Sequence, residues 1–226
     1  MIQLLKNWQE IGDATLFIQR QGLPSHTGIC KNWDHFWLYQ LLKNQDKQAK
    51  VIDLGCGDGS TLKLISSLGF SDVHGIDFQI SWSLRLYQMK SFLKRKCLPF
   101  VLHKGDITYT KFPDQTYDFA ISISVIEHGV DINKFLKESY RILKNNGTLF
   151  ITTDYWEEKI ETAQSTQAFG LSWKVFSQHE INTMITLAKE VGFVVDEQEI
   201  PACEDKNILW NNAEYTFIGI LFRKID

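Results

Sequence analysis

The chain has 226 residues, of which 44% are apolar, and its formal net charge at pH 7 is -3. This length and apolar share are enough for one globular unit with a core of its own. The negative charge, with no dense basic run beyond KSFLKRK at residues 90–96, argues against a protein that binds nucleic acid.

The cysteines and the apolar runs indicate a reducing compartment and no membrane segment. Four cysteines lie far apart without a C-x-x-C pair, which argues against a zinc site and against a disulfide framework. The first residues lack the pattern of a signal peptide, and no apolar run reaches membrane-spanning length. HEIN at residues 179–182 is followed by Thr183 where a zinc motif needs a second histidine. We therefore expect a cytoplasmic protein without a metal.

From residue 50 onward, short strand-type runs alternate with helix-type periods. The strand-type runs lie at 50–54, 72–76, 98–102, 117–123 and 147–153, and the helix-type periods lie at 60–69, 81–96 and 131–143. Two more strand candidates lie at 192–200 and 213–224. The pattern predicts an α/β fold with a Rossmann-like, mostly parallel, seven-stranded sheet and helices on both faces.

The two ends of the chain differ from this alternating middle. Residues 1–45 are rich in aromatic side chains and are predicted to form a helical cap on the cofactor-binding core at 46–153. A substrate-side loop is expected at 154–176, followed by a helix and a strand pair at 177–226. Ser177 and Glu180 match a capping box, and Gly192 suits the end of that helix. We interpret the whole chain as a single domain.

A glycine-rich loop follows the first strand of the predicted core. The stretch VIDLGCGDGS places Gly55, Gly57 and Gly59 directly behind an apolar run. Glycines at this turn let a ligand approach the backbone closely. The spacing G-x-G-x-G differs from the nicotinamide fingerprint, and Asp53 and Asp58 would repel a pyrophosphate. Carboxylates around the loop favour a ligand with cationic groups, such as S-adenosylmethionine.

Residues 49–151 resemble the class I S-adenosylmethionine-dependent methyltransferases. VIDLGCGDGS is similar to the first motif of that family, VHGID to its ribose-binding position and HKGDI to its adenine-binding position. YDFAISISVIEH and RILKNNGTLFITT are similar to the signatures of its fourth and fifth strands. SHTGICKNWDHFWLYQLL, TTDYWEE and SWKVFSQHEI also resemble a subgroup found among small-molecule and glycan-tailoring methyltransferases.

The resemblance implies a set of cofactor-binding residues. Asp53 and the loop backbone would meet the methionine end, and Asp77 would accept the ribose hydroxyls. Asp106 and Ile107 would bind the adenine, while Phe78 would stack on the adenine or the ribose. The complete expected set is Asp53, Gly55, Cys56, Gly57, Asp77, Phe78, Asp106, Ile107 and Ser122.

The acceptor is expected beyond the carboxyl ends of the fourth and fifth strands. His128 follows the fourth strand and is the candidate base for an acceptor hydroxyl, although a role in shaping the site is an equal alternative. The residues expected to line the acceptor pocket are His26, Trp37, Asp154, Tyr155 and Trp156, with Glu158 as a further candidate.

Together these features predict methyl transfer from S-adenosylmethionine to a small-molecule or sugar acceptor, at a hydroxyl. One alternative is a partner subunit that binds the cofactor without turnover. The other is a nicotinamide oxidoreductase, which the glycine spacing disfavours. The sequence leaves the oligomeric state open.

Overall fold

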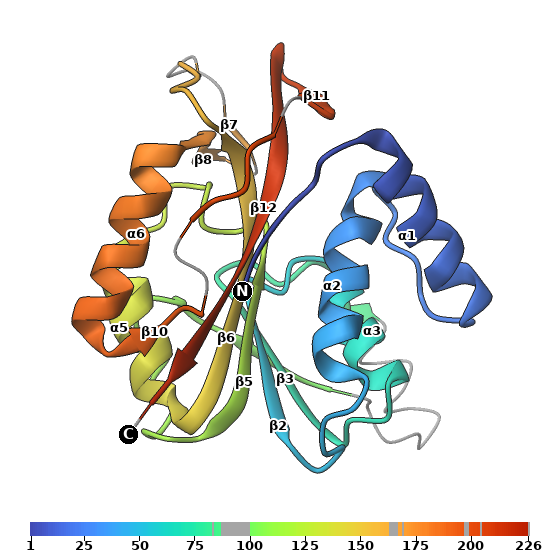
Figure 1. Cartoon of the computed structure of the whole chain (residues 1–226). Coiled ribbons are helices and arrows are strands. Elements are labelled where there is room, and N and C mark those ends of the chain that lie inside the picture. The colour runs from blue at the N-terminus through green and yellow to red at the C-terminus, as the bar shows by residue number, and fades with distance from the viewer. Residues whose placement is uncertain are drawn as a thin grey trace.

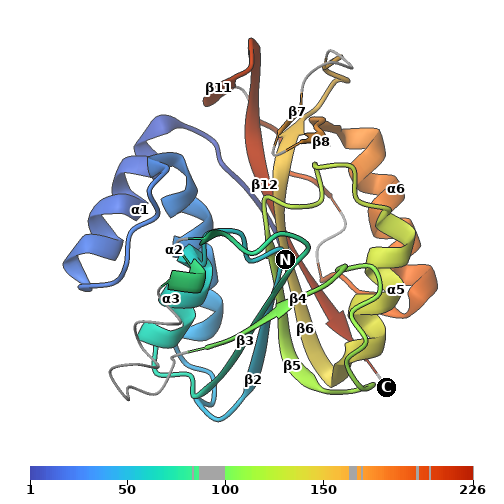
Figure 2. The same cartoon turned by 180° about the vertical axis from the view of Figure 1, so that it is seen from behind.

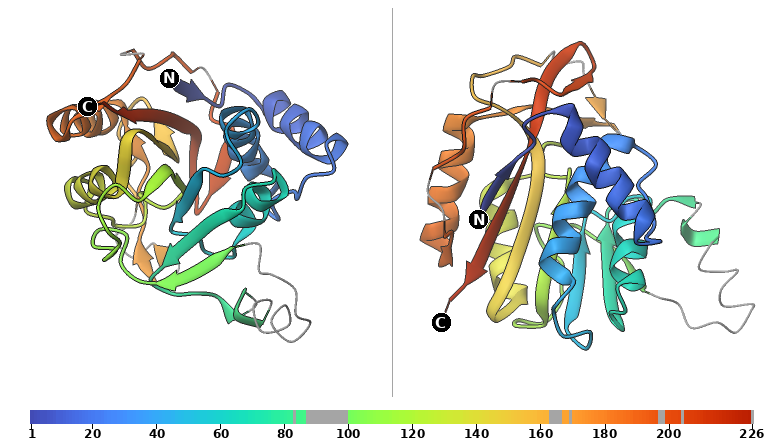
Figure 3. Two further views of the ribbon diagram at one scale, coloured as in Figure 1. Left: turned by 90° about the horizontal axis from the view of Figure 1, so that it is seen from below. Right: turned by 45° about the vertical axis from the view of Figure 1, so that its right-hand side comes forward.

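A central sheet separates two layers of helices in the computed structural model, which describes residues 1–226 except 83, 87–99, 163–166, 169, 197–198, 204 and 226 (Figure 1). On one face lie α2 (Asn32–Leu42) and α3 (Ser60–Ser67), with α1 (Trp8–Arg20) packed outside α2. On the other face lie α5 (Ile132–Ile142) and α6 (Gln178–Val191). Viewed from below, the strands lie between these layers (Figure 3), so the predicted fold class is confirmed.

Seven strands form the main path of the sheet, in the order β1-β12-β6-β5-β2-β3-β4. Every pair from β6 to β4 is parallel, whereas β12 runs antiparallel to both β6 and β1. Figure 2 shows β4, the last strand of this path, from behind. Parallel strands end at one edge of a sheet, so the segments that follow them meet there. The seven strands are β1 (Ile2–Leu4), β2 (Lys50–Leu54), β3 (Asp72–Asp77), β4 (Val101–Lys104), β5 (Tyr117–Ile123), β6 (Leu143–Trp156) and β12 (Ala213–Lys224).

Short strands extend this sheet beyond the predicted seven. β9 (Phe176–Ser177) joins β6, while β10 (Phe193–Val194) and β11 (Ile208–Trp210) join β12, so the sheet has ten strands among the described residues. The expected loop at 154–176 also contains a small hairpin of β7 (Gln167–Ala168) and β8 (Leu171–Ser172). Its first residues continue β6 as far as Trp156, because β12 pairs with them up to Tyr155.

The amino-terminal segment is only partly the predicted helical cap. It begins with strand β1, whose residues pair with Ile218 to Ile220 of β12. Ile2 and Leu4 are buried, so the strand covers an edge that would otherwise expose apolar side chains. The cap proper consists of α1, a short 3-10 helix η1 (Ile29–Lys31) and α2.

Three other predicted elements differ at their boundaries. The strand expected at 98–102 begins at Val101, where it pairs with His74 of β3, and residues 98–99 lie outside the described range. Of the helix expected at 81–96, residues 82 and 84–86 are helical, and positions 83 and 87–96 lie outside the described range. The strand expected at 192–200 is reduced to β10, with residues 197–198 also outside that range.

The helix at the start of the last third forms as the sequence predicts. The Ser177 hydroxyl accepts the N–H of Glu180, and the Glu180 carboxylate accepts the N–H of Ser177. The helix ends at Gly192, whose φ of 114° is accessible to glycine at little cost. None of the helices in the described ranges combines the length and the apolar character that crossing a bilayer requires.

Candidate cofactor and acceptor site

The glycine loop begins at the carboxyl end of β2. Gly55 and Cys56 donate their N–H groups to the Ile76 carbonyl of β3, over 2.8 and 3.1 Å. Gly55 has a φ of 90°, and a Cβ built on it would lie 2.5 Å from the Val125 side chain. Glycine is therefore required here by both conformation and packing.

Gly57 marks the open side of the loop. Its φ is 46°, and an added Cβ would meet no described atom within 4 Å. Its N–H donates to Oδ2 of Asp77 over 2.9 Å. The loop thus presents bare backbone to an open space while a carboxylate from the next strand fixes its position, as a close-fitting ligand requires.

Asp77 lies at the carboxyl end of β3 and links the loop to the strand. Besides the bond from Gly57, its Oδ1 accepts the N–H of Gln79 over 2.8 Å. The residue is 8% exposed. Each carboxylate oxygen has a second lone pair, so Asp77 keeps acceptor capacity for ligand hydroxyls at the place where the loop opens.

Asp53 is a buried carboxyl group beside the loop, and no cation of the described residues forms an ion pair with it. Its exposed fraction is 2%, and its Oδ2 has no hydrogen-bond partner in the described part of the chain. Burial, followed by the neighbouring carboxylates of Asp77 and Asp58, raises the pKa of Asp53 well above its usual value. A cationic group bound beside the loop would stabilise the ionised carboxylate, so these residues fit the ammonium of S-adenosylmethionine.

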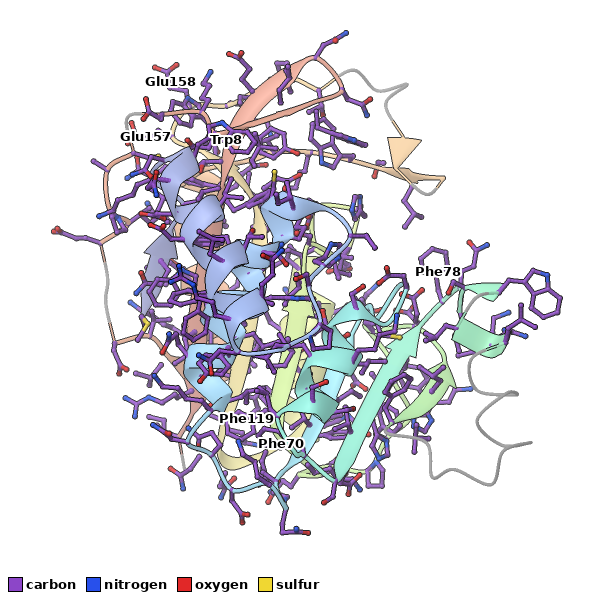
Figure 4. The ribbon with its side chains drawn as sticks, turned by 90° about the vertical axis from the view of Figure 1, so that its right-hand side faces the viewer. Trp8, Phe70, Phe78, Phe119, Glu157 and Glu158 are labelled. Atoms are coloured by element: carbon purple, nitrogen blue, oxygen red, sulfur yellow. The ribbon has the colours of Figure 1, made fainter. Side chains whose placement is uncertain are left out.

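Other expected cofactor residues lie around this loop with different exposure. Asp106 is exposed, and its Oδ1 accepts the N–H and the hydroxyl of Thr108, both over 2.7 Å. Ile107 is 9% exposed, and Phe78 is 50% exposed. Figure 4 shows Phe78 just beyond the end of β3, far from Glu158, which lies at the top of that view with Glu157.

The side chains of Cys56 and Ser122 are engaged inside the protein. Ser122 is fully buried, and its hydroxyl donates to the Leu54 carbonyl over 3.1 Å. Cys56 is buried, and burial raises the pKa of its thiol. A Cβ on Gly75 would lie 2.9 Å from its Sγ, so the thiol packs tightly against β3. These contacts connect β2 with its neighbours and leave a cofactor role only to the Cys56 backbone.

His128 lies in the turn after β5, where its N–H donates to the Val125 carbonyl over 3.1 Å. Burial, and then the charge of Lys31, lowers the pKa of His128 to about 4. The imidazole is therefore neutral at pH 7 and can accept a proton, although the lowered pKa makes it a weaker base than an exposed histidine.

The structure also assembles a buried charge cluster that sequence patterns did not reveal. The ammonium of Lys31 lies 3.9 Å from Oδ2 of Asp34 and 3.9 Å from Oδ1 of Asp154. Trp173 donates its indole N–H to Asp154 over 2.8 Å. Close by, Glu127 accepts the hydroxyl of Thr153 over 3.0 Å. The cap, the turn after β5 and the end of β6 thus meet around one lysine.

The three carboxylates of this cluster are strongly desolvated. Asp34 is fully buried, Glu127 is 1% exposed and Asp154 is 4% exposed. Burial raises the pKa of Asp34 to about 6 and raises that of Asp154. For Glu127, burial and then the charge of Asp154 raise the pKa. The positive charge of Lys31 opposes all three shifts, so one ammonium faces three buried carboxyl groups.

Two of the residues expected in the acceptor pocket, Asp154 and His26, lie where the cap meets the sheet. Nδ1 of His26 accepts the N–H of Gly28 over 2.9 Å, and its ring lies 5.3 Å from that of His35. Burial lowers the pKa of His26, and Asp58 of the glycine loop opposes that shift. Trp37 is half-buried and packs against Trp33 within the cap.

The two residues that follow Asp154 lie on opposite faces of β6, and only Trp156 shares the face of Asp154. Successive side chains on a strand point to opposite faces, so Tyr155 points away from the face that Asp154 uses. Tyr155 is fully buried in the apolar core formed with Phe176 of β9 and Ile181 of α6. Trp156 is half-buried beneath the ammonium of Lys206, 4.8 Å from the ring centroid. The structure thus does not bring Tyr155 to the acceptor side.

Comparison with known proteins places the chain in a family. The profile of the methyltransferase domain family matches residues 30–198. The chain is 28% identical to the sterol 24-C-methyltransferase of Aspergillus fumigatus over 84% of this chain and 51% of the relative. It is 28% identical to the ubiquinone biosynthesis O-methyltransferase of Bradyrhizobium diazoefficiens over 66% of this chain and 57% of the relative. The chain thus spans little more than half the length of these relatives.

A solved structure with the same fold is geranyl diphosphate methyltransferase in complex with S-adenosylmethionine. The two folds match with a TM-score of 0.65 over 85% of this chain and 84% of that one, at 13% sequence identity. Together with the family profile and the glycine loop, this likeness shows that the chain belongs to the class I S-adenosylmethionine-dependent methyltransferases.

Proposed function

We propose that this protein transfers the methyl group of S-adenosylmethionine to a small-molecule acceptor, at a hydroxyl. The observation that carries the proposal is the buried carboxyl group of Asp53 beside the open glycine loop, whose Oδ2 has no hydrogen-bond partner among the described residues. An unpaired buried carboxylate is costly, and a bound ammonium removes that cost. A reduced nicotinamide cofactor would bring phosphates to this place instead, and Asp53, Asp58 and Asp77 would repel them.

The residues divide among the parts of the cofactor. Asp53 and the backbone of Gly55 to Gly57 hold the methionine end, and Asp77 accepts the ribose hydroxyls through its remaining lone pairs. Asp106 and Ile107 bind the adenine, and the exposed ring of Phe78 covers it. When bound, the cofactor supplies an electrophilic methyl group on a sulfonium.

The acceptor lies between the cap and the ends of β5 and β6. His128 is neutral there, so its imidazole can accept the proton of a hydroxyl as the oxygen attacks. The excess of buried carboxylates over Lys31 disfavours an anionic acceptor. Sterol and ubiquinone-precursor enzymes among the relatives agree with a neutral small molecule, whereas neither of these names points to a sugar.

The free thiols of Cys30, Cys56 and Cys203 agree with a reducing compartment, and we propose the cytoplasm as the site of action. The function is tested by incubating the protein with S-adenosylmethionine and a panel of neutral hydroxyl-bearing acceptors, and measuring S-adenosylhomocysteine. Cofactor binding with product formation supports an enzyme. Binding without product for any acceptor favours the non-catalytic partner subunit, and tighter binding of NADH than of S-adenosylmethionine overturns the proposal.

A further inference from the structure

Lys31 connects the cap to three strands of the sheet. It is the last residue of η1, and its ammonium donates to the hydroxyl of Ser124, directly after β5. The same ammonium lies 3.9 Å from Asp154 of β6 and 3.5 Å from the ring centroid of Phe217 on β12. A single side chain of the cap therefore contacts the ends of β5 and β6, where the proposed acceptor lies, and the neighbouring strand β12.

The surroundings of this ammonium are closed and acidic. The Lys31 side chain is 21% exposed, and the side chains of its partners Asp34 and Asp154 are 0% and 6% exposed. The charge of Lys31 is the strongest influence that favours the ionised form of the buried Asp34, ahead of the Thr152 hydroxyl, so the nearby ammonium is its main compensation. The charge of Lys31 also acts on His26, Cys30, Glu127 and His128, and Tyr215 lies against Asp154.

The contact at Ser124 has a second feature that favours a positioning role. Ser124 has a φ of 52°, a left-handed conformation that is unfavourable for a residue with a Cβ. Its N–H donates to the Thr152 carbonyl of β6 over 3.0 Å, and its hydroxyl accepts the Lys31 ammonium. The cap thus holds the strained residue that joins β5 to the turn carrying His128.

We propose that Lys31 is a positioning residue that holds the cap against the acceptor end of the sheet through its positive charge. The link to turnover rests on the function proposed above, whereas the hold on the cap does not. Without the ammonium, Asp34 and Asp154 are buried carboxylates with no counter-ion beside them. The cap must then separate from the sheet, or the carboxylates must take up protons.

The first test compares two equal substitutions in the cap. Lys31→Met keeps most of the side-chain volume and removes the charge. Lys43→Met makes the same change at the exposed end of α2. Hydrogen exchange at pH 8, measured by mass spectrometry over residues 26–42, should be faster by about tenfold or more in Lys31→Met and within about twofold of wild type in Lys43→Met. Equal exchange in both variants would overturn the proposal.

The second test separates charge from packing through pH and a second substitution. Carboxyl groups whose pKa is raised by folding destabilise the native state increasingly as pH rises through that pKa. The loss of Tm in Lys31→Met should therefore be small at pH 5 and several degrees larger at pH 8. At pH 8, Asp34→Asn should raise the Tm of Lys31→Met by more than it raises the Tm of the wild type, and Lys31→Arg should retain most of the wild-type Tm.

If Lys31→Met does not fold at pH 8, the double variant Lys31→Met with Asp34→Asn is measured instead, and its Tm tests the same proposal. A Tm loss that is independent of pH, or that Asp34→Asn relieves by no more than its gain in the wild type, would mean that Lys31 acts by packing alone. S-adenosylhomocysteine affinity, measured by calorimetry at pH 6, should stay within about threefold of wild type, because Lys31 touches none of the cofactor residues. Failure of the wild type to bind the cofactor would sink the proposed function and leave the Lys31 result intact.

Discussion

The two sides of the site are built in different ways. On the cofactor side, the proposed functional residues lie within three residues of the ends of β2, β3 and β4. Hydrogen bonds from backbone N–H groups connect the segments that carry them. On the acceptor side, Lys31, Asp34, Glu127 and Asp154 come from the cap, from a turn and from a strand more than a hundred residues away.

The two sides therefore have different structural requirements. The cofactor side presents carboxylates and open backbone at fixed positions, and the sheet provides these by itself. The acceptor side depends on a cap closing over buried charges, so its geometry requires a counter-ion from another element. Mutations on the first side should therefore change ligand affinity, and mutations on the second side should change turnover or stability.

The largest effect is expected at Asp77. Asp77→Ala removes the acceptor for the ribose hydroxyls and the anchor of the Gly57 N–H. S-adenosylmethionine affinity should fall by about 3 to 5 kcal/mol, by the magnitudes of charge-assisted hydrogen bonds. Asp72→Ala is a matched control, since Asp72 begins the same strand at the opposite edge. Calorimetry that finds equal affinities for the two variants would remove Asp77 from the cofactor side.

Gly57 tests whether the open space beside the loop belongs to the ligand. Gly57→Val adds side-chain atoms where no described atom lies nearby, so only an approaching ligand is blocked. Cofactor affinity should fall on the order of 100-fold, from strain and lost contact together. Gly22→Val makes the same change at a φ of 65°, also in open space, and controls for strain alone. Comparable affinities in both variants would show that the ligand lies elsewhere.

His128 tests the division between affinity and turnover. His128→Asn should lower kcat by about 100-fold, the smaller end of general-base effects, with S-adenosylmethionine affinity within about threefold. In the wild type, the pKa of about 4 predicts a rate that rises with pH below that value and is flat from pH 6 to 8. If His128→Asn retains the wild-type kcat and pH profile, the histidine only shapes the site.

Asp34 gives the smallest effect and reports on the acceptor side alone. Its folded pKa of about 6 lies above the usual value of 3.8, so its ionisation weakens folding above pH 6 and has no effect below pH 3. Asp34→Asn should therefore raise the free energy of unfolding by about 1 to 2 kcal/mol at pH 8, and less at pH 4. Denaturant titrations at the two pH values measure this. A destabilised variant at pH 8 would contradict the raised pKa.

The neighbourhood of the proposed cofactor residues could be predicted from the sequence because its signals are local. Gly55, Gly57 and Asp53 lie within one stretch, and Asp77 ends the next strand, so spacing alone indicates their neighbourhood. In the structure, the Gly57 N–H donates to Asp77. The strand order of a doubly wound sheet makes the segments after β2 and β3 neighbours, so such a contact is expected.

The acceptor side could not be predicted in the same way. Charged residues such as Lys31 and Asp34 are usually exposed, so a pattern gives no reason to bury them together. Tyr155 was misplaced because the extension of β6 fixes its side chain on the face opposite Asp154, and an expected loop carries no such alternation. Glu127 directly precedes His128, and that adjacency was the available signal.

The most direct test of the account is the affinity of S-adenosylmethionine for the wild type and for Asp53→Asn, measured by calorimetry in two buffers of different ionisation enthalpy. The account predicts one binding site and a loss on the order of 10- to 100-fold in the variant. Because a bound ammonium opposes the burial and the neighbouring carboxylates that raise the pKa of Asp53, binding to the wild type should release more protons than binding to the variant. Equal affinities with equal proton release, or a wild type that does not bind, would contradict the account.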